Sequence, residues 1–250
     1  MSILLVVFII PIALVPLVNA QEGEVTLNPT DDTYTDSYNP NSNYGGQSTL
    51  KVSRYEYFDE IPEEIVWLKF NLSDVPDGAV VDIATLELHC SFALETYNVY
   101  AHSCSDNSWN ELTLTYSNMP SYNSTSMDST VVASSEWYSW NVIDAVRKAV
   151  NGIHGGPDVV TIVLLETALR GMFSSVSFYS KDGGALFVPK LTIHWSDIVP
   201  EFPTWTTMLL ILIVLTGTIV IYKQRPHGYR KKILRNIKYQ NGGRVFVNTF

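Results

Sequence analysis

The stretch Val66-Trp67-Leu68-Lys69-Phe70-Asn71 decides the fold. Its apolar positions 66, 68 and 70 alternate with positions 67, 69 and 71. Successive side chains of a strand point to opposite faces, so a period of two predicts a half-buried antiparallel strand. The pattern therefore predicts that Val66, Leu68 and Phe70 face a core and that Trp67 and Lys69 face outward.

The same alternation recurs through the middle of the chain, at residues 86–88, 176–179 and 190–195. Further strands are predicted at Thr33–Ser37, Thr49–Ser53, Asn98–Ser103, Thr113–Tyr116, Val131–Ala133 and Val159–Thr167, the last of them central. Turn residues separate them, at residues 39–43, 76–78 and 182–184. Residues 142–150 instead show helical spacing, with Asn141 as N-cap and Gly152 as stop. The sequence predicts an all-β domain, a jelly-roll β-sandwich with one short helix.

Apolar runs flank this domain. Residues 3–17 are almost entirely apolar, and the small residue Ala20 and a polar sequence from Gln21 follow them. This pattern predicts a signal peptide over residues 1–20. An uncleaved N-terminal anchor is the alternative. Residues 204–222 form a second run of 19 residues, about the length needed to cross a bilayer core, with Trp205 and Tyr222 at its ends. We expect a transmembrane helix there.

Charge is divided sharply along the chain. All 25 acidic residues lie between Glu22 and Glu201 with eight of the 16 basic residues, which gives that stretch a net charge of −17. The other eight basic residues follow the second apolar run. The positive-inside rule then places the basic tail, residues 223–250, in the cytoplasm and the domain outside the cell. An acidic domain repels phosphates, so nucleic acid is excluded as its ligand.

The domain, residues 21–198, is joined to the apolar run by residues 199–203, which contain two prolines and predict a short stiff linker. The string Pro200-Glu201-Phe202-Pro203 resembles the C-terminal anchors of many archaeal surface proteins.

Catalytic motifs are missing from the sequence. There is no GxSxG, HExxH or phosphate-binding glycine loop. The acid pairs Asp31-Asp32 and Glu63-Glu64 are sequence neighbours, which a strand would turn to opposite faces. We expect that the chain is not an enzyme. A polysaccharide-cleaving enzyme and a structural or adhesion protein with a protein partner are the alternatives.

Several strings follow one another in order along the domain. They are residues 32–37, 39–45 and 50–52, then 67–73 with 84–88, 107–111 with 114–120, 140–142 with Asp144 and Val146, and 178–182 with 189–191. Together they resemble the DNRLRE domain, the type of carbohydrate-binding module family 96, which is related to the disaggregatase repeats of archaea. The acidic and aromatic segment Tyr55–Glu64 departs from the pattern as an insertion would. The resemblance implies a jelly roll that binds polysaccharide, anionic in some members.

Strand parity suggests where such a ligand binds. Sugar rings stack on aromatic faces, and their hydroxyls or carboxylates need polar partners. We expect Trp67 and Tyr179 to form an exposed stacking surface, with Lys51, Lys69 and Lys181 as its polar groups. Ordinary edge protection and solubility are the alternative role for lysines on strands.

Three further sites are candidates. Structural Ca²⁺ is one, since hard oxygen ligands are plentiful in Asp31, Asp32, Asp36 and Asn39–Asn43. An oxidising compartment would permit a disulfide between Cys90 and Cys104, and two buried thiols are the alternative. Two sequons predict N-glycosylation, at Asn71 and Asn123.

Overall fold

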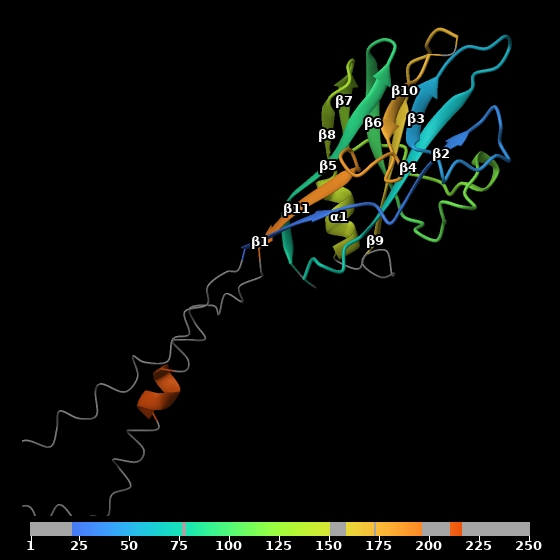
Figure 1. Ribbon diagram of the computed structural model, residues 1–250. Coiled ribbons are helices and arrows are strands. Elements are labelled where there is room, and N and C mark those ends of the chain that lie inside the picture. Colours follow the sequence, from blue (N-terminus) through green and yellow to red (C-terminus); the bar gives the residue numbers. More distant parts are fainter. Residues whose placement is uncertain (1–21, 77–78, 151–158, 173, 197–210, 217–250) are drawn as a thin grey trace, which may run out of the picture. The chain divides into compact units, whose positions relative to one another are not determined.

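The computed structural model describes residues 22–76, 79–150, 159–172, 174–196 and 211–216 (Figure 1). The chain divides into two compact units, Met1–Val199 and Pro200–Phe250. Antiparallel strands dominate the first unit, which confirms the all-β prediction. The strands are β1 (Glu22–Leu27), β2 (Asp31–Asp36), β3 (Thr49–Arg54), β4 (Glu63–Asn71), β5 (Val80–Ala93), β6 (Tyr97–Cys104), β7 (Asp128–Val132), β8 (Trp137–Asn141), β9 (Val159–Glu166), β10 (Val176–Tyr179) and β11 (Lys190–Ser196).

The strands form one continuous sheet that curls into two facing halves. Its order is β1-β11-β5-β10-β3-β4-β9-β6-β7, with β8 also paired to β5 and β2 to β4. We call β1, β11, β5, β8 and β10 the β5 half, and β2, β4, β9, β6 and β7 the β4 half. Strand β3 links them, because it pairs with β10 and, at Ser53 and Arg54, with β4. Strand β9 lies between β4 and β6, as its apolar sequence predicted.

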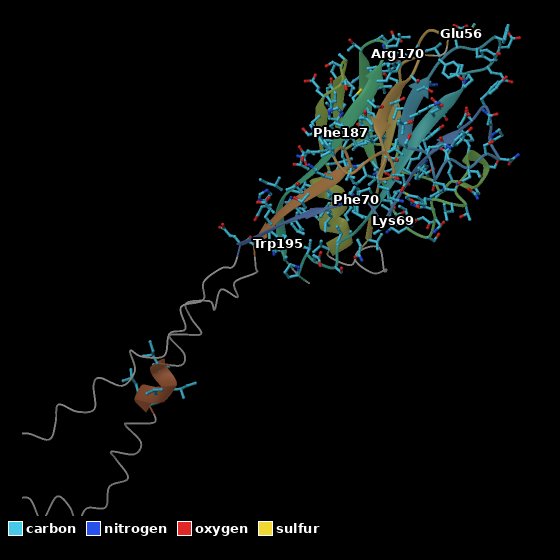
Figure 2. All side chains as sticks on the ribbon, in the orientation of Figure 1. Glu56, Lys69, Phe70, Arg170, Phe187 and Trp195 are labelled. Atoms are coloured by element: carbon cyan, nitrogen blue, oxygen red, sulfur yellow. The ribbon has the colours of Figure 1, made fainter. Side chains whose placement is uncertain are left out.

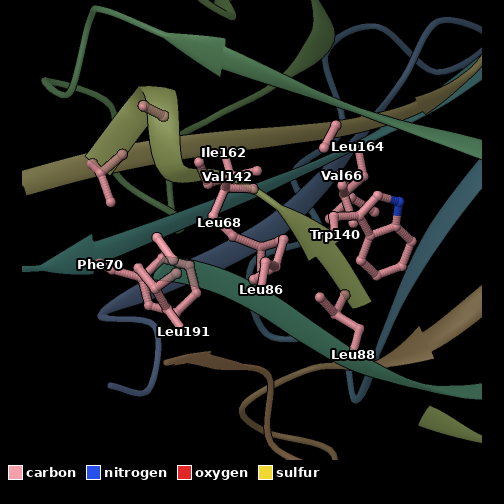
Figure 3. Close-up of a cluster of buried hydrophobic side chains, with 14 of the residues drawn as sticks. Val66, Leu68, Phe70, Leu86, Leu88, Trp140, Val142, Ile162, Leu164 and Leu191 are labelled. Carbon is pink, nitrogen blue, oxygen red and sulfur yellow. The ribbon is translucent and has the colours of Figure 1, made fainter. Parts of the chain in front are cut away.

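The core lies between the two halves. Val66, Leu68 and Phe70 of β4 are fully buried in one cluster with Leu86 and Leu88 of β5 (Figure 3). The indole nitrogen of Trp140, on β8, also donates to the Val99 carbonyl of β6 at 2.8 Å, which ties the β5 half to the β4 half. The domain is thus a sandwich-like all-β fold.

Helix α1 (Ile143–Val150) covers one end of this core. It buries Ala145, Val146 and Ala149, the face that the helical spacing predicted. The Asn141 side chain accepts a hydrogen bond from the Ile143 backbone at 3.1 Å and so caps the first turn. The predicted stop, Gly152, lies outside the described residues.

Two strands were missed and one prediction of a strand was wrong. Strands β1 and β8 were not predicted. The segment Thr113–Tyr116 is not a strand: the Thr113 and Leu114 backbones donate to the Asn110 carbonyl in a turn, and the 3-10 helix η2 (Tyr116–Asn118) follows. These residues belong to the long connection between β6 and β7.

Most of the predicted membrane and targeting segments lie outside the described residues, namely 1–20, 199–203, 223–250 and the greater part of 204–222. Within the last, residues 211–216 are helical with exposed side chains. No helix among the described residues has the length and hydropathy to cross a membrane.

Candidate functional site

The outer face of the β4 half is covered by protein. Trp67 does point away from the main core, yet its side chain is 0% exposed. Trp109 and Tyr122, from the connection between β6 and β7, pack edge-on against it at ring-centroid distances of 6.3 and 6.1 Å. Its indole nitrogen donates to Thr35 Oγ1 at 3.1 Å. The prediction of an exposed Trp67 is therefore wrong, because parity assigned the face correctly but another segment buries that face.

Lys69 is also enclosed. Its side chain is 11% exposed, and Nζ lies 3.5 Å from Asp31 Oδ2. The ammonium donates to the Trp109 carbonyl and sits 4.4 Å from the centroid of the Trp109 ring, a cation–π contact. Lys69 thus anchors the connection between β6 and β7, residues 105–127, which we call the covering segment.

Lys181 belongs to the same network. Its Nζ lies 2.9 Å from Glu111 Oε1 and 3.3 Å from Asp182 Oδ2. Its backbone nitrogen donates to Asp32 Oδ2 at 2.7 Å, and the Asp32 backbone nitrogen donates to Glu111 Oε2 at 3.0 Å. We call Asp31, Asp32, Lys69, Glu111, Lys181 and Asp182 the acid–lysine cluster. It ties β2 and β4 to the covering segment and to the turn after β10.

Asp32 is the buried centre of this cluster. It is 1% exposed, and its Oδ1 has no hydrogen-bond partner among the described residues. Burial raises the pKa of the Asp32 carboxyl to about 7, against the lowering effect of Lys181.

Among the predicted calcium ligands, Asp36 is engaged by protein donors. Asp36 accepts from the Tyr38 backbone, the Asn39 amide and the Tyr44 hydroxyl. In the part of the chain that the structure describes, no three His, Cys, Asp or Glu side chains are placed to hold a metal ion. Calcium binding stays a prediction.

Lys51 and Tyr179 lie elsewhere. Lys51 is half-exposed, with Nζ 3.8 Å from Glu64 Oε1 and 5.6 Å from the centroid of the Tyr34 ring. Tyr179 is half-buried on the outer face of the β5 half. The structure therefore unites Lys69 with Lys181 but does not combine the five predicted residues into one site.

Around Tyr179 the β5 half carries an open aromatic surface. Phe187 stacks on Tyr179 at 4.8 Å and lies 4.3 Å from the His89 ring, which Trp137 contacts edge-on at 5.3 Å. Lys190 Nζ is 4.6 Å from the centroid of the Trp137 ring. We call His89, Trp137, Tyr179, Phe187 and Lys190 the aromatic face; Figure 2 labels Phe187.

Pairing and parity explain why these side chains meet. Leu88 and Cys90 face the core, so His89 between them points outward, and it is the register partner of Trp137. Trp137 remains 37% exposed. The Nδ1 atom of His89 is buried and has no hydrogen-bond partner among the described residues. Of these residues, sequence analysis identified Tyr179 alone, because the strand that carries Trp137 was missed and Phe187 lies in a loop.

The cysteines do not form the predicted disulfide. Both are free and buried. Cys90 packs in the main core, whereas Cys104 packs in the second cluster beside Trp67 and Trp109. They belong to opposite faces of the sheet, so the pairing prediction is wrong.

Both sequon asparagines are exposed. Each side-chain oxygen accepts from the backbone two residues later, Asn71 from Ser73 and Asn123 from Thr125. Glycosylation at these positions stays a prediction.

Comparison with known protein families identifies a match. The sequence model of carbohydrate-binding module family 96 matches residues 23–194, which include every strand of the domain except part of β1 and β11. A search of curated proteins finds no match. The aromatic face and the acid–lysine cluster lie within the matched range, and the chain belongs to carbohydrate-binding module family 96.

Proposed function

We propose that this protein is a membrane-anchored, extracellular polysaccharide receptor that holds its ligand on the aromatic face. Its family is one of non-catalytic carbohydrate-binding modules, which supports binding rather than cleavage. We also propose that its sandwich has jelly-roll topology.

We choose the outer face of the β5 half as the ligand-binding surface because the outer face of the β4 half is covered by other residues of the chain. On the β4 half, Trp67 is buried beneath the connection between β6 and β7, whose Trp109 and Leu114 pack in the same cluster. On the β5 half, Trp137 is solvent-accessible beside Phe187 and Tyr179. Sugar rings bury their C–H faces on aromatic planes, and aromatic side chains with a polar rim are typical of binding sites. This exposed aromatic group is the observation that carries the proposal.

The same geometry favours an uncharged polysaccharide over the anionic class. Lys51, Lys69 and Lys181 each pair with a carboxylate. Lys190 is the basic member of the aromatic face, and its register partner is Glu87. The net charge of −17 over Glu22–Glu201 adds a long-range repulsion toward polyanions.

Anchoring rests on the sequence. The apolar run 204–222 and the eight basic residues after it favour a single membrane span with a cytoplasmic tail. The helical residues 211–216, whose apolar side chains are exposed, fit such a span.

Trp137→Ala tests the proposal. The full chain, in a detergent without a sugar headgroup, is titrated with soluble neutral and uronic-acid polysaccharides. We expect Trp137→Ala to weaken binding of a neutral polysaccharide at least about tenfold, on the order of 1.4 kcal/mol, because it removes the exposed stacking ring. The control is Leu112→Ala, an exposed apolar residue on the segment that covers the other half.

Unchanged affinity in Trp137→Ala would refute the aromatic face as the site. Shortened glycan products after incubation would instead indicate a polysaccharide-cleaving enzyme. Binding of none of the glycans would favour a structural or adhesion role.

A further inference from the structure

The chain between β3 and β4 forms a narrow hairpin at one end of the domain, the end where Figure 2 labels Glu56 and Arg170. Tyr57 and Glu60 exchange two backbone hydrogen bonds of 3.0 Å, so Phe58 and Asp59 form a two-residue turn. The Glu56 backbone nitrogen donates to the Arg170 carbonyl at 3.2 Å, and Tyr55 pairs with Arg170. The hairpin is thereby fixed to the segment after β9.

Phe58 occupies a strained position in this turn. Its φ is +53°, in the left-handed region, where a bulky residue is an outlier and glycine is the residue that two-residue hairpin turns favour. For an L-residue this conformation costs roughly 1–2 kcal/mol. The Phe58 side chain is 76% exposed, so burial does not offset that cost. The ring is held out in water at the expense of stability, and strain of this kind is concentrated at functional sites.

Phe58 is part of a group of rings. It packs edge-on against Tyr57 at 4.6 Å, and Tyr57 packs edge-on against Tyr38 at 5.3 Å. Tyr38 is 49% exposed. Tyr57 and Phe58 are on the fixed hairpin, and Tyr38, just after β2, packs against them. Rings held in this way form a preorganised aromatic surface with little conformational entropy to lose on binding.

A pocket of about 330 Å³ adjoins these rings. Its walls are Glu56, Phe58, Arg170, Gly171 and Met172. The volume is at the small end of ligand pockets, which suits a short stretch of glycan rather than a long chain.

Arg170 supplies the polar side of this pocket and is itself held in place. Its Nη2 bonds Glu166 Oε2 at 2.7 Å, and the guanidinium lies 5.3 Å from the centroid of the Tyr97 ring. Arg170 Nε is buried without a hydrogen-bond partner in the described ranges. Glu166 neutralises the guanidinium and Glu56 lines the pocket, while Asp59 and Glu60 follow in the same hairpin. This local charge repels anions and favours neutral ligands.

We propose that this rim pocket is a second carbohydrate site, separate from the aromatic face, that stacks one or two neutral sugar rings on Phe58. It extends the proposed function, because two sites on one domain allow a polysaccharide to be held at both or two chains to be bridged. Tyr38, Tyr57 and Phe58 share no residue with the aromatic face, so each site can be removed without the other.

The test is calorimetric titration of the full chain with cellohexaose, xylohexaose and mannohexaose, in a detergent without a sugar headgroup. For at least one hexasaccharide we expect the wild-type chain to bind two equivalents. Phe58→Gly and Trp137→Ala should each bind one equivalent, and the double variant should bind none. In the Trp137→Ala background, Phe58→Gly should weaken the remaining binding at least tenfold. The melting temperature of Phe58→Gly should equal or exceed that of the wild type, since glycine relieves the strained φ at position 58.

Two further variants separate the ring from the turn. Phe58→Ala keeps a non-glycine turn but should lose binding, whereas Phe58→Tyr keeps the ring and should retain it. Leu112→Gly, exposed and on the covering segment, is the matched control and should change neither stoichiometry nor affinity.

Equal binding by Trp137→Ala and by the double variant would overturn the rim site and leave the aromatic face intact. Loss of all binding in Phe58→Gly alone would support the rim site and remove the aromatic face. A wild-type chain that binds none of the three hexasaccharides would overturn the rim proposal.

Discussion

Replacement of Asp32 by asparagine is the sharpest test of the acid–lysine cluster. The carboxyl is 1% exposed; Oδ2 accepts from the Lys181 backbone, while Oδ1 has no partner among the described residues. An ionised carboxylate is poorly solvated there, and burial raises the pKa of Asp32 from 3.8 to about 7. Asparagine keeps the shape and the accepted hydrogen bond but cannot ionise.

The sign of the effect follows from proton linkage. Between pH 3.8 and about 7 the folded state keeps the Asp32 proton, whereas the unfolded state releases it. Folding stability from this group is therefore fully present below the unfolded pKa and is lost as pH rises through the folded pKa. A shift of about three pKa units corresponds to about 4 kcal/mol at 1.36 kcal/mol per unit.

Urea unfolding of the full chain, followed by tryptophan fluorescence from pH 4 to 8, measures this loss. The free energy of unfolding of the wild type should fall by up to about 4 kcal/mol more than that of Asp32→Asn between pH 4 and pH 8. Burial also raises the pKa of Glu64, but Glu64 is present in both proteins and cancels in the difference. The exposed Asp74→Asn is the control. The reasoning would be refuted if the free energies of unfolding of wild type and Asp32→Asn changed in parallel with pH. It would also be refuted if the wild type became more stable relative to the variant as the pH rose.

Two other predictions concern the second cluster and the cysteines. Trp67→Ala should lower the free energy of unfolding by about 3–5 kcal/mol in denaturant titrations, because it empties the space beneath Trp109, and a loss below 1 kcal/mol would contradict the buried position. Alkylation of the unreduced, denatured protein should label two thiols by mass spectrometry, and reductant should leave the melting temperature unchanged, since Cys90 and Cys104 are free; blocked thiols would contradict this.

Strand parity was predictable from sequence because it depends on local backbone geometry. Val66, Leu68 and Phe70 are in the core, and Trp67 and Lys69 are on the other side of β4, as the alternation indicated. Whether an outer face meets water is a separate question. It depends on packing between segments distant in sequence, which a period of two does not encode.

A sequence signal for the covering segment did exist. Trp109, Leu114 and Met119 are apolar residues within a polar stretch that has no strand periodicity. Such residues need a surface to pack on, and Trp67 and Val163 provide it. The Trp137 strand was harder to detect, because tryptophan occupies both an exposed position, Trp137, and a core position, Trp140.

Lys181, which sequence analysis assigned to ligand binding, instead helps to fix the turn that follows Tyr179. The Lys181 backbone is bonded to buried Asp32, and the Ser180 backbone donates to the Ser48 carbonyl at 3.1 Å. Gly183 follows so closely that a Cβ would lie 2.3 Å from that same carbonyl. The turn that begins one residue after Tyr179 is thus held against Ser48. The chain continues from this turn to Phe187, whose ring stacks on Tyr179 at a centroid distance of 4.8 Å. A stacking surface must be rigid to bind without a large entropic cost. The acid–lysine cluster holds this turn through the Lys181 backbone, and its lysines pair with carboxylates of the same domain. This arrangement supports the proposal that the aromatic face binds uncharged sugar.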